Sequence, residues 1–392
     1  MADPASLPEP DRIDGAPHPR ETRSLFGHAE AQAGFLDAFR SGRLHHGWLI
    51  AGPKGIGKAT LAWHLARFLL ATPDDDGGMF AAPPPETLDI PDEHPVARRM
   101  RALAEPRLFL LRRGPNDKGT ALSQVIAVDE VRKLKSFFTL SAADGGRRAA
   151  IVDAADEMNP SAANALLKLL EEPPPGAFFF LIAHQPNRLL PTIRSRCREL
   201  RLHPLPPQDL SDALVQAGGE IAPEDRQPLA ELAAGSVGEA FRLTNAGGLE
   251  TYGALLRLLS DLPRLDRSRA LALAETATGK QGAERFELIL TLLDTFLSRL
   301  ARAGALGATP PEAAPGEAAL IARLAPTPAA ALAWADVGHD LAARARRGKA
   351  VNLDPAALLM DILLKIDETA GQLVPCPMRD PDDDAAPACR SP

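Results

Sequence analysis

Residues 52–58 read Gly-Pro-Lys-Gly-Ile-Gly-Lys, and their glycines and final lysine have the spacing of a phosphate-binding loop. In the pattern G-x-x-x-x-G-K-[ST], backbone N–H groups wrap phosphate oxygens, the lysine reaches the outer phosphates, and a Ser or Thr hydroxyl holds Mg²⁺. The candidate nucleotide-binding residues of this loop are Gly52, Gly55, Gly57 and Lys58. Ala59 replaces the hydroxyl, and Thr60 is displaced from that position by about 100° around a helix. The sequence therefore predicts a phosphate cradle that lacks one magnesium ligand.

Asp153 is a further candidate for the nucleotide site, because it ends the apolar run 149–152. In P-loop enzymes an apolar strand ends in an Asp that orients the metal, and the next residue is normally a Glu that aligns the attacking water. This chain has Ala154 at that position, and Glu157, three residues after it, is predicted to cap a helix. A structural acid at a strand end is the alternative interpretation of Asp153.

Two arginines flank Ser195, and by composition alone Arg194 and Arg196 are ordinary solvated side chains. Cys197 follows them, and a small packing residue is the prediction there rather than a reactive thiol. These residues acquire a role only from the motifs around them.

The elements that must position these residues are strands and helices in alternation. Continuous apolar runs between helices are typical of parallel strands that are buried on both faces. Such runs occur at 48–50, 108–111, 149–152 and 178–182, and a fifth strand is expected at 198–202. The glycine loop lies between the first strand and a predicted helix at 59–70, which is the context that a P-loop requires.

After residue 208 the sequence predicts helices alone, so the fold class combines an α/β part with an all-α part. The predicted domains are an α/β domain with a parallel five-stranded sheet at 23–204, a small helical domain at 205–247 and a larger helical domain at 248–371. The flanking segments, 1–22 and 372–392, are rich in proline or acids and are predicted to be disordered tails.

Composition narrows the classes of function. The net charge of −7 argues against a protein that binds nucleic acid by itself. No segment approaches the roughly 20 apolar residues of a membrane span, and nothing resembles a signal peptide. Three cysteines are too few for a disulfide framework or a four-ligand zinc site. We therefore expect a cytoplasmic protein with no metal site, no zinc and no membrane partner.

Taken together and in this order, the motifs resemble the clamp-loader branch of the AAA+ ATPases. The run Leu-Leu-Lys-Leu-Leu-Glu-Glu-Pro-Pro at 166–174 and the triplet Ser-Arg-Cys at 195–197 are highly specific to that branch. Residues 45–48 and 188–197 resemble one subunit type within it. The motif match covers about residues 24–245. The resemblance implies an AAA+ P-loop domain, a helical lid at 205–247 and a helical collar at 248–371 that joins subunits in a five-membered ring.

The resemblance also implies a role for Arg196, which is expected to reach the ATP of a neighbouring motor subunit. A trans arginine of this kind can contribute about 10³–10⁵-fold to the rate. Gly238 stands where motor subunits carry a second sensing arginine. Ala59, Ala154 and Gly238 thus each remove a different part of the hydrolytic apparatus, whereas the residue that acts on a neighbour is kept.

The expected protein is a subunit with neither ATPase nor polymerase activity, in a complex that loads a sliding clamp onto primed DNA. It requires no cofactor, and the sequence leaves open whether the loop holds ATP, ADP or nothing. One alternative is an active motor ATPase in which Thr60 and Glu157 replace the missing groups. Another is a nucleotide-gated binding protein outside replication.

Overall fold

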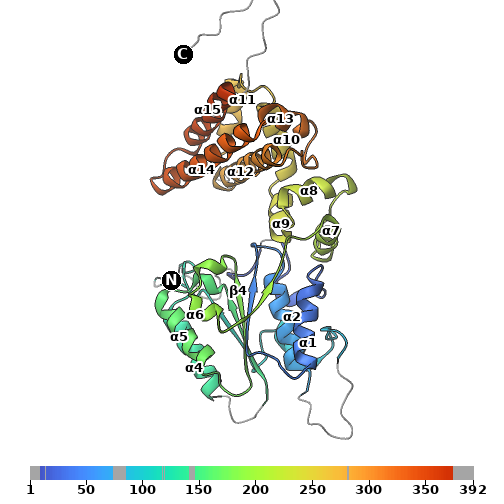
Figure 1. The fold of residues 1–392 in the computed structure, drawn as a ribbon. Helices are drawn as coiled ribbons and strands as arrows, with labels where there is room; N and C mark the ends of the chain where they lie inside the picture. Colours follow the sequence, from blue (N-terminus) through green and yellow to red (C-terminus); the bar gives the residue numbers. More distant parts are fainter. Residues whose placement is uncertain are drawn as a thin grey trace, which may run out of the picture. The chain divides into compact units, whose positions relative to one another are not determined.

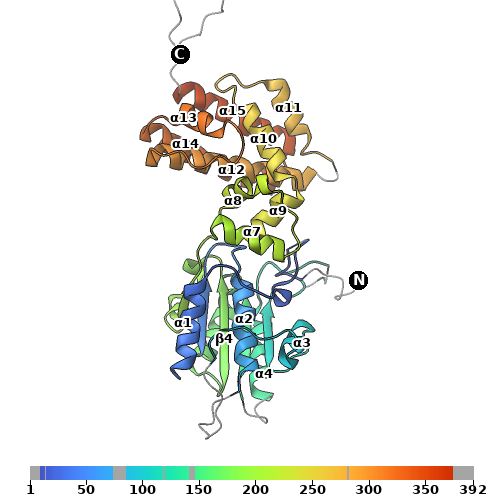
Figure 2. The ribbon, with the colours of Figure 1, turned by 90° about the vertical axis from the view of Figure 1, so that its right-hand side faces the viewer.

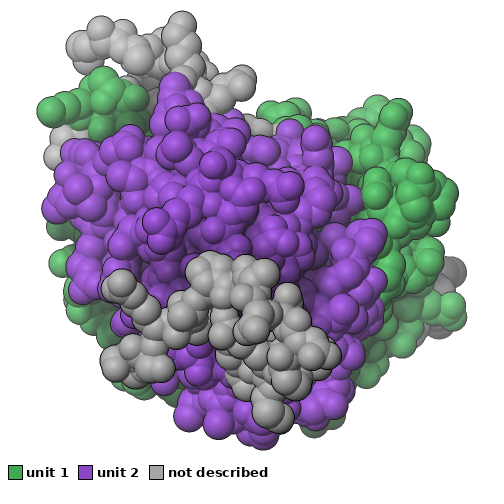
Figure 3. All heavy atoms as spheres, turned by 90° about the horizontal axis from the view of Figure 1, so that it is seen from above, with its two compact units in different colours: residues 1–242 green, residues 243–392 purple. Residues whose placement is uncertain are grey.

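The structure, a computed structural model, describes residues 9–13, 15–73, 85–116, 118, 120–140, 146–279 and 282–373. It divides into two compact units, residues 1–242 and 243–392 (Figure 3). The first unit contains the sheet and the helices around it, and the second is helical in its described part. The division of the helical residues into a lid and a collar at 247/248 stays a prediction.

The first unit is built on a parallel sheet of five strands, in the order β2-β3-β4-β1-β5 (Figure 1). The strands are β1 (Gly47–Ala51), β2 (Leu108–Arg112), β3 (Arg148–Asp153), β4 (Ala177–Ala183) and β5 (Arg198–Arg201). The structure confirms all five predicted strands. With the glycine loop after β1, it also confirms an AAA+ P-loop domain.

Helices cover both faces of the sheet (Figures 1 and 2). One face carries α1 (Ala29–Arg40), α2 (Lys58–Ala71) and α3 (Pro95–Arg101), and the other carries α4 (Val128–Leu140), α5 (Pro160–Glu171) and α6 (Pro191–Arg194). Successive side chains of a strand point to opposite faces. Trp48 and Ile50 therefore enter the first core while Leu49 enters the second. This double burial explains the continuous apolar runs.

Short 3₁₀ turns and three further helices accompany the sheet in the described chain. The 3₁₀ turns are η2 (Pro19–Glu21), η4 (Ala155–Glu157), η5 (Pro186–Arg188) and η6 (Pro223–Asp225). The helices that follow the sheet are α7 (Pro207–Gln216), α8 (Arg226–Ala233) and α9 (Val237–Asn245). The last of these begins beside the glycine loop.

Residues 9–13 and 15–22 are ordered, which corrects the prediction of a disordered tail for this part of 1–22, and residues 1–8 and 14 lie outside the described part. In the described part of this segment, His18 is fully buried and packs edge-on against Trp63 of α2, with 5.8 Å between ring centroids. Arg67 of the same helix donates to the carbonyl of Arg20 at 2.9 Å. Polar groups rather than an apolar pattern hold the segment, which is why periodicity did not reveal it.

The second unit contains α10 (Gly248–Leu259), α11 (Arg267–Glu275), α12 (Gly282–Leu306), α13 (Glu317–Leu324), α14 (Pro328–Ala350) and α15 (Pro355–Leu373). Asp354 caps α15 by accepting the N–H of Ala357 at 3.0 Å. Residues 372 and 373, assigned to the C-terminal tail, are instead helical, and residues 374–392 lie outside the described part. In the described chain, no single helix has the length and apolar character of a membrane span, although α13 and α14, bent by 103°, meet the criteria together.

A buried ionic cluster centres on Glu317, the first residue of α13. Its carboxylate accepts from Arg299 of α12 at 2.7 Å, from the hydroxyl of Tyr252 at 2.6 Å and from the N–H of Ala313 at 2.6 Å. The Glu317 residue is 1% exposed and Arg299 is 8% exposed. Burial and the neighbouring carboxylate raise the pKa of Tyr252, so this hydroxyl stays a donor.

Glu317→Ala is expected to lower the free energy of unfolding of the helical unit by about 3–5 kcal/mol, because Arg299 would remain buried without its carboxylate. Urea unfolding followed by circular dichroism measures the change. The matched control is Glu368→Ala, which removes the exposed partner of Lys365 and should cost less than about 1 kcal/mol. Equal losses in the two variants would contradict the prediction.

Candidate functional site

The glycine loop lies at the carboxyl end of β1 and leads directly into α2. Gly55 and Gly57 have φ angles of 79° and 101°, which favour glycine. A Cβ on Gly55 would lie 2.4 Å from the hydroxyl oxygen of Ser236, and one on Gly52 would lie 2.6 Å from the carbonyl oxygen of Leu202. The φ angles and these close neighbours therefore favour glycine in the loop. The loop also places N–H groups at the start of a 14-residue helix, where anions are favoured.

Lys58 is buried and turned toward its own loop. Its Nζ donates to the carbonyl of Gly52 at 2.8 Å and also to that of Pro53. Burial lowers the pKa of Lys58 to about 8, although the charges of Asp153 and Asp156 oppose that shift. The ammonium group thus lies among loop carbonyls and nearby carboxylates.

Asp153 ends β3 and lies close enough to Lys58 for their charges to interact. Burial raises its pKa to about 7, the negative charges of Asp11 and Glu157 add to this effect, and Lys58 and Arg112 oppose it. A carboxyl that is partly protonated at neutral pH is a weak metal ligand. Since Ala59 supplies no hydroxyl, the residues present fit a phosphate but fit Mg²⁺ poorly.

The acids after Asp153 are engaged elsewhere. Asp156 accepts the backbone N–H groups of His184 at 3.1 Å and Gln185 at 2.8 Å. Glu157 forms an ion pair with Arg113 at 2.9 Å. The prediction that Glu157 caps a helix is wrong, because the chain forms only the single turn η4 at this point. Ala154, at the position of the water-aligning Glu, is itself buried.

The start of α9 is bonded to the glycine loop. Ser236 donates its hydroxyl to the carbonyl of Lys54 at 3.0 Å, and the N–H of Gly238 donates to the carbonyl of Gly55 at 3.0 Å. A Cβ on Gly238 would lie 3.0 Å from the Cα of Gly55. A side chain at position 238 would therefore require Ile13 to move and Gly55 to shift by a few tenths of an ångström. Arg242, one turn later, is paired with Glu239.

Arg196 lies at the opposite edge of the sheet. Its guanidinium donates to the carbonyl of Thr192 at 3.0 Å and pairs with Glu171, the last residue of α5, at 2.8 Å. The carbonyl oxygen of Arg196 is 3.1 Å from the position of a Cβ on Gly47, the first residue of β1. The five residues of β1 span about 16 Å. Arg196 therefore cannot serve the glycine loop of its own chain.

The structure thus brings five of the six predicted site residues together and leaves Arg196 apart. The residues that meet at the carboxyl edge are Gly52, Gly55, Gly57, Lys58 and Asp153. Cys197, next to Arg196, is half-buried, and burial raises the pKa of its thiol to about 12. It packs against the core on the α5 side, in keeping with a packing role.

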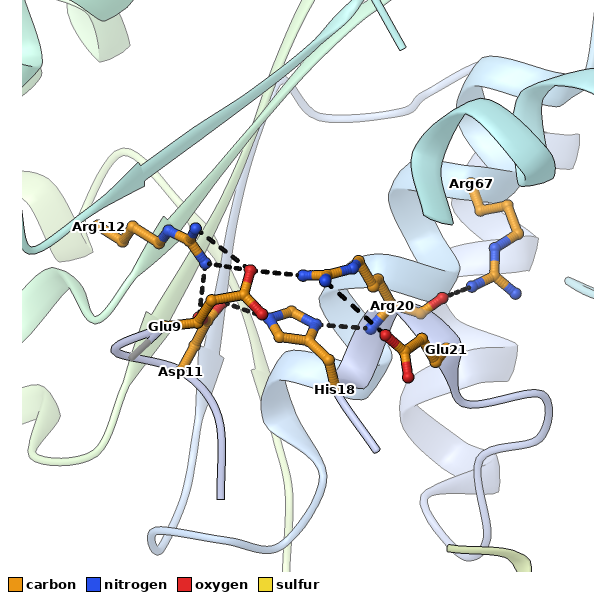
Figure 4. A network of polar contacts seen from close by, with 7 residues as sticks. All are labelled: Glu9, Asp11, His18, Arg20, Glu21, Arg67 and Arg112. Carbon is orange, nitrogen blue, oxygen red and sulfur yellow. Dashed lines mark hydrogen bonds and ion pairs between the residues drawn. The ribbon is translucent and has the colours of Figure 1, made fainter. Parts of the chain in front are cut away.

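Sequence reasoning missed Arg112 and the two acids that contact it. Arg112 is the last residue of β2 and is the ladder partner of Asp153. Its guanidinium is 2.7 Å from a carboxylate oxygen of Asp11 and 3.4 Å from one of Glu9 (Figure 4). One signal could have identified Arg112. It ends an apolar run that forms the strand next to that of Asp153. Nothing in the pattern of residues 9–11 marked the acids.

Comparison with known proteins identifies the family. A family model described as "DNA polymerase III, delta subunit" matches residues 27–206. DNA polymerase III subunit delta' of Pseudomonas aeruginosa is 37% identical over 203 residues, which cover 52% of this chain and 56% of that protein, or about half its length. The subunit of the same name from Escherichia coli is 30% identical over 345 residues, which cover 87% of this chain and 95% of that protein. The chain belongs to the family of DNA polymerase III delta' subunits.

This membership in the delta' family confirms the resemblance to the clamp-loader branch that residues 166–174 and 195–197 carry. The similarity extends more weakly to a subunit of another type. DNA polymerase III subunit tau of Escherichia coli is 27% identical over 277 residues, which cover 69% of this chain and 40% of the tau protein.

Asp153→Asn is expected to raise the free energy of unfolding at pH 8 and to raise it clearly less at pH 5. The folded chain keeps a proton on Asp153 up to about pH 7, whereas the unfolded chain releases it near pH 4, so this carboxyl costs stability as the pH rises between these values. Lys58 does not interfere in this range, because its lowered pKa of about 8 makes stability depend on its titration only above about pH 8. Urea unfolding at the two pH values measures the difference.

The control for this prediction is Asp129→Asn, which alters an exposed carboxylate in the first turn of α4. It should give the same small change at both pH values. A stabilisation by Asp153→Asn that is as large at pH 5 as at pH 8 would show that the pKa of Asp153 is not raised.

Proposed function

We propose that this chain acts as the delta' subunit of a bacterial DNA polymerase III clamp loader. In this role it joins gamma/tau motor subunits and a delta subunit in a hetero-pentameric ring that loads the sliding clamp onto primer-template DNA. It hydrolyses no ATP itself and supplies Arg196 to the ATP site of a neighbouring motor subunit. The observation that carries this proposal is the location of Arg196, at the sheet edge opposite its own glycine loop.

The chemistry of Arg196 suits a donated residue. Its side chain is 36% exposed and contacts Thr192 and Glu171, which lie within its own domain. A guanidinium can exchange one carboxylate partner for phosphate oxygens in the same planar, two-pronged geometry. Glu171 therefore holds the arginine at the surface until a phosphate competes for it.

The chain's own loop supports the non-hydrolysing part of the proposal. Ala59 removes a magnesium ligand, the position of the water-aligning Glu is the buried Ala154, and Gly238 supplies no sensing arginine. Ser236 and Gly238 bond the loop to the start of α9, through the carbonyls of Lys54 and Gly55. Binding of ATP or ADP without hydrolysis remains compatible with this arrangement.

Arg196→Ala in a reconstituted five-subunit complex should slow hydrolysis at the adjacent motor site by a factor on the order of 10³, because the transferring phosphoryl group loses its trans cation. Single-turnover ATP hydrolysis is measured in the presence of clamp and primed DNA. The kinetic phase that comes from the adjacent motor site should be lost. Size-exclusion chromatography should show that the complex still assembles. A chain that fails to assemble with motor and delta subunits would contradict the assignment to replication.

The matched control is Arg194→Ala, which removes an exposed arginine two residues away and should leave all phases intact. Unchanged hydrolysis in the Arg196→Ala complex would refute the donated arginine. It would leave the role of the chain in assembly to be tested separately.

The alternative of an active motor ATPase requires Glu157 to align water, but its carboxylate is already paired with Arg113. We therefore expect the isolated chain to show no steady-state ATP hydrolysis above that of its Lys58→Ala variant. A phosphate-release assay on the two purified proteins decides between the alternatives. Turnover that Lys58→Ala abolishes would favour the motor.

A further inference from the structure

We propose that residues 9–13 and 15–22, the N-terminal strap, cover the candidate nucleotide site and compete with nucleoside di- or triphosphate for it. The strap is a built-in occupant of the site, and nucleotide binds only when the strap opens. This inference depends on the glycine loop and its neighbours within one chain, so it stands independently of clamp loading.

One end of the strap is fixed at the carboxyl edge of the sheet. Asp11 pairs with Arg112 at 2.7 Å, and Glu9 lies 3.4 Å from the same guanidinium (Figure 4). Arg112 is the ladder partner of Asp153, so these acids lie beside the strand end that P-loop proteins use for the metal and phosphates. The negative charge of Asp11 is close enough to act on Asp153.

The strap next passes the junction between the glycine loop and α9. The Cδ1 atom of Ile13 lies 2.7 Å from the position of a Cβ on Gly238. The N–H of Gly238 is in turn bonded to the carbonyl of Gly55, inside the loop. Ile13 therefore occupies the space in which a sensing side chain from α9 would reach a bound nucleotide.

The other end of the strap is anchored on α2. His18 is buried and its Nε2 lies 3.1 Å from the carboxylate of Asp11, so the two ends of the strap contact each other. Arg20 pairs with Glu9 at 2.7 Å. The backbone carbonyl of Thr22 is 3.2 Å from the Nε2 of His64, a further residue of α2. Both ends of the segment that crosses the site are thus fixed to the α/β unit.

The charges of the strap oppose a nucleotide. Burial alone would raise the pKa of Glu9 and of Asp11, but contacts with Arg20, His18 and Arg112 outweigh burial and lower both values. The two carboxylates are therefore ionised at neutral pH. They bring negative charge to a site whose ligand carries phosphate groups, and they engage Arg112, a cation of the same edge.

The affinity of a site that is open only part of the time falls in proportion to the open fraction. Removal of the two charges that fasten the strap should increase that fraction. We expect Glu9→Gln combined with Asp11→Asn to tighten binding of a fluorescent ADP or ATP analogue to the full chain by about 10-fold or more. Fluorescence anisotropy at fixed ionic strength gives the two dissociation constants.

Two further variants give the test its specificity. Glu30→Gln combined with Asp37→Asn removes one Glu and one Asp from exposed positions on α1 and should bind like the unaltered chain. Adding Lys58→Ala to the strap variant should abolish the gain, which assigns it to the glycine loop. Hydrogen–deuterium exchange should show faster exchange of residues 9–13 and 15–22 in the strap variant and unchanged protection of the sheet, which establishes that the variant is folded.

Equal affinity of the unaltered chain and the strap variant would overturn the proposal, and so would the absence of measurable binding by both. A gain that survives Lys58→Ala would also overturn it, because the nucleotide would then bind elsewhere. None of these outcomes bears on the donated Arg196, which is tested through a neighbouring subunit, so the two proposals can fail separately.

Discussion

The pairing of β1 with both β4 and β5 is the interaction on which the rest of the first unit depends. The strand is buried along its whole length, and its side chains alternate between the two cores. Parallel pairing fixes its direction, so the glycine loop must leave from one edge of the sheet and Gly47 must lie at the other. The distance between the loop and Arg196 follows from the length of this one strand.

The glycine loop shows how a nucleotide-binding shape can persist after its side-chain chemistry is reduced. Its backbone is in contact with the carbonyl of Leu202 after β5 and with Ser236 and Gly238 at the start of α9. Any larger residue at Gly52 or Gly55 would disturb these contacts. Ala59, in contrast, is partly buried against the α2 core and takes part in none of them. The glycines thus have a structural role that the magnesium hydroxyl never had.

The sequence predicted best where a single physical pattern decides the structure. Strands buried on both faces leave continuous apolar runs, and all five were identified. Spacing identified the loop, and the order of motifs identified the fold. Prediction from the sequence failed where polar contacts between distant segments determine the structure. The strap is held by Arg112, which is about 100 residues away, and Glu157 is paired with Arg113. No local pattern reports such pairs.

The sequence indicates the loss of an arginine at Gly238, and in the structure the loop and Ile13 lie close to this position.

The two edges of the sheet differ in how their charged side chains are paired. At the carboxyl edge, Glu9 and Asp11 of the strap pair with Arg20 and Arg112 within the chain. At the amino edge, Arg196 has one carboxylate partner and remains partly exposed. An arginine with one exposed partner can change partners at low cost, whereas several ion pairs that are mostly buried resist such an exchange. The same sheet thus leaves Arg196 partly exposed at one edge, while the cations of the other edge are engaged within the chain.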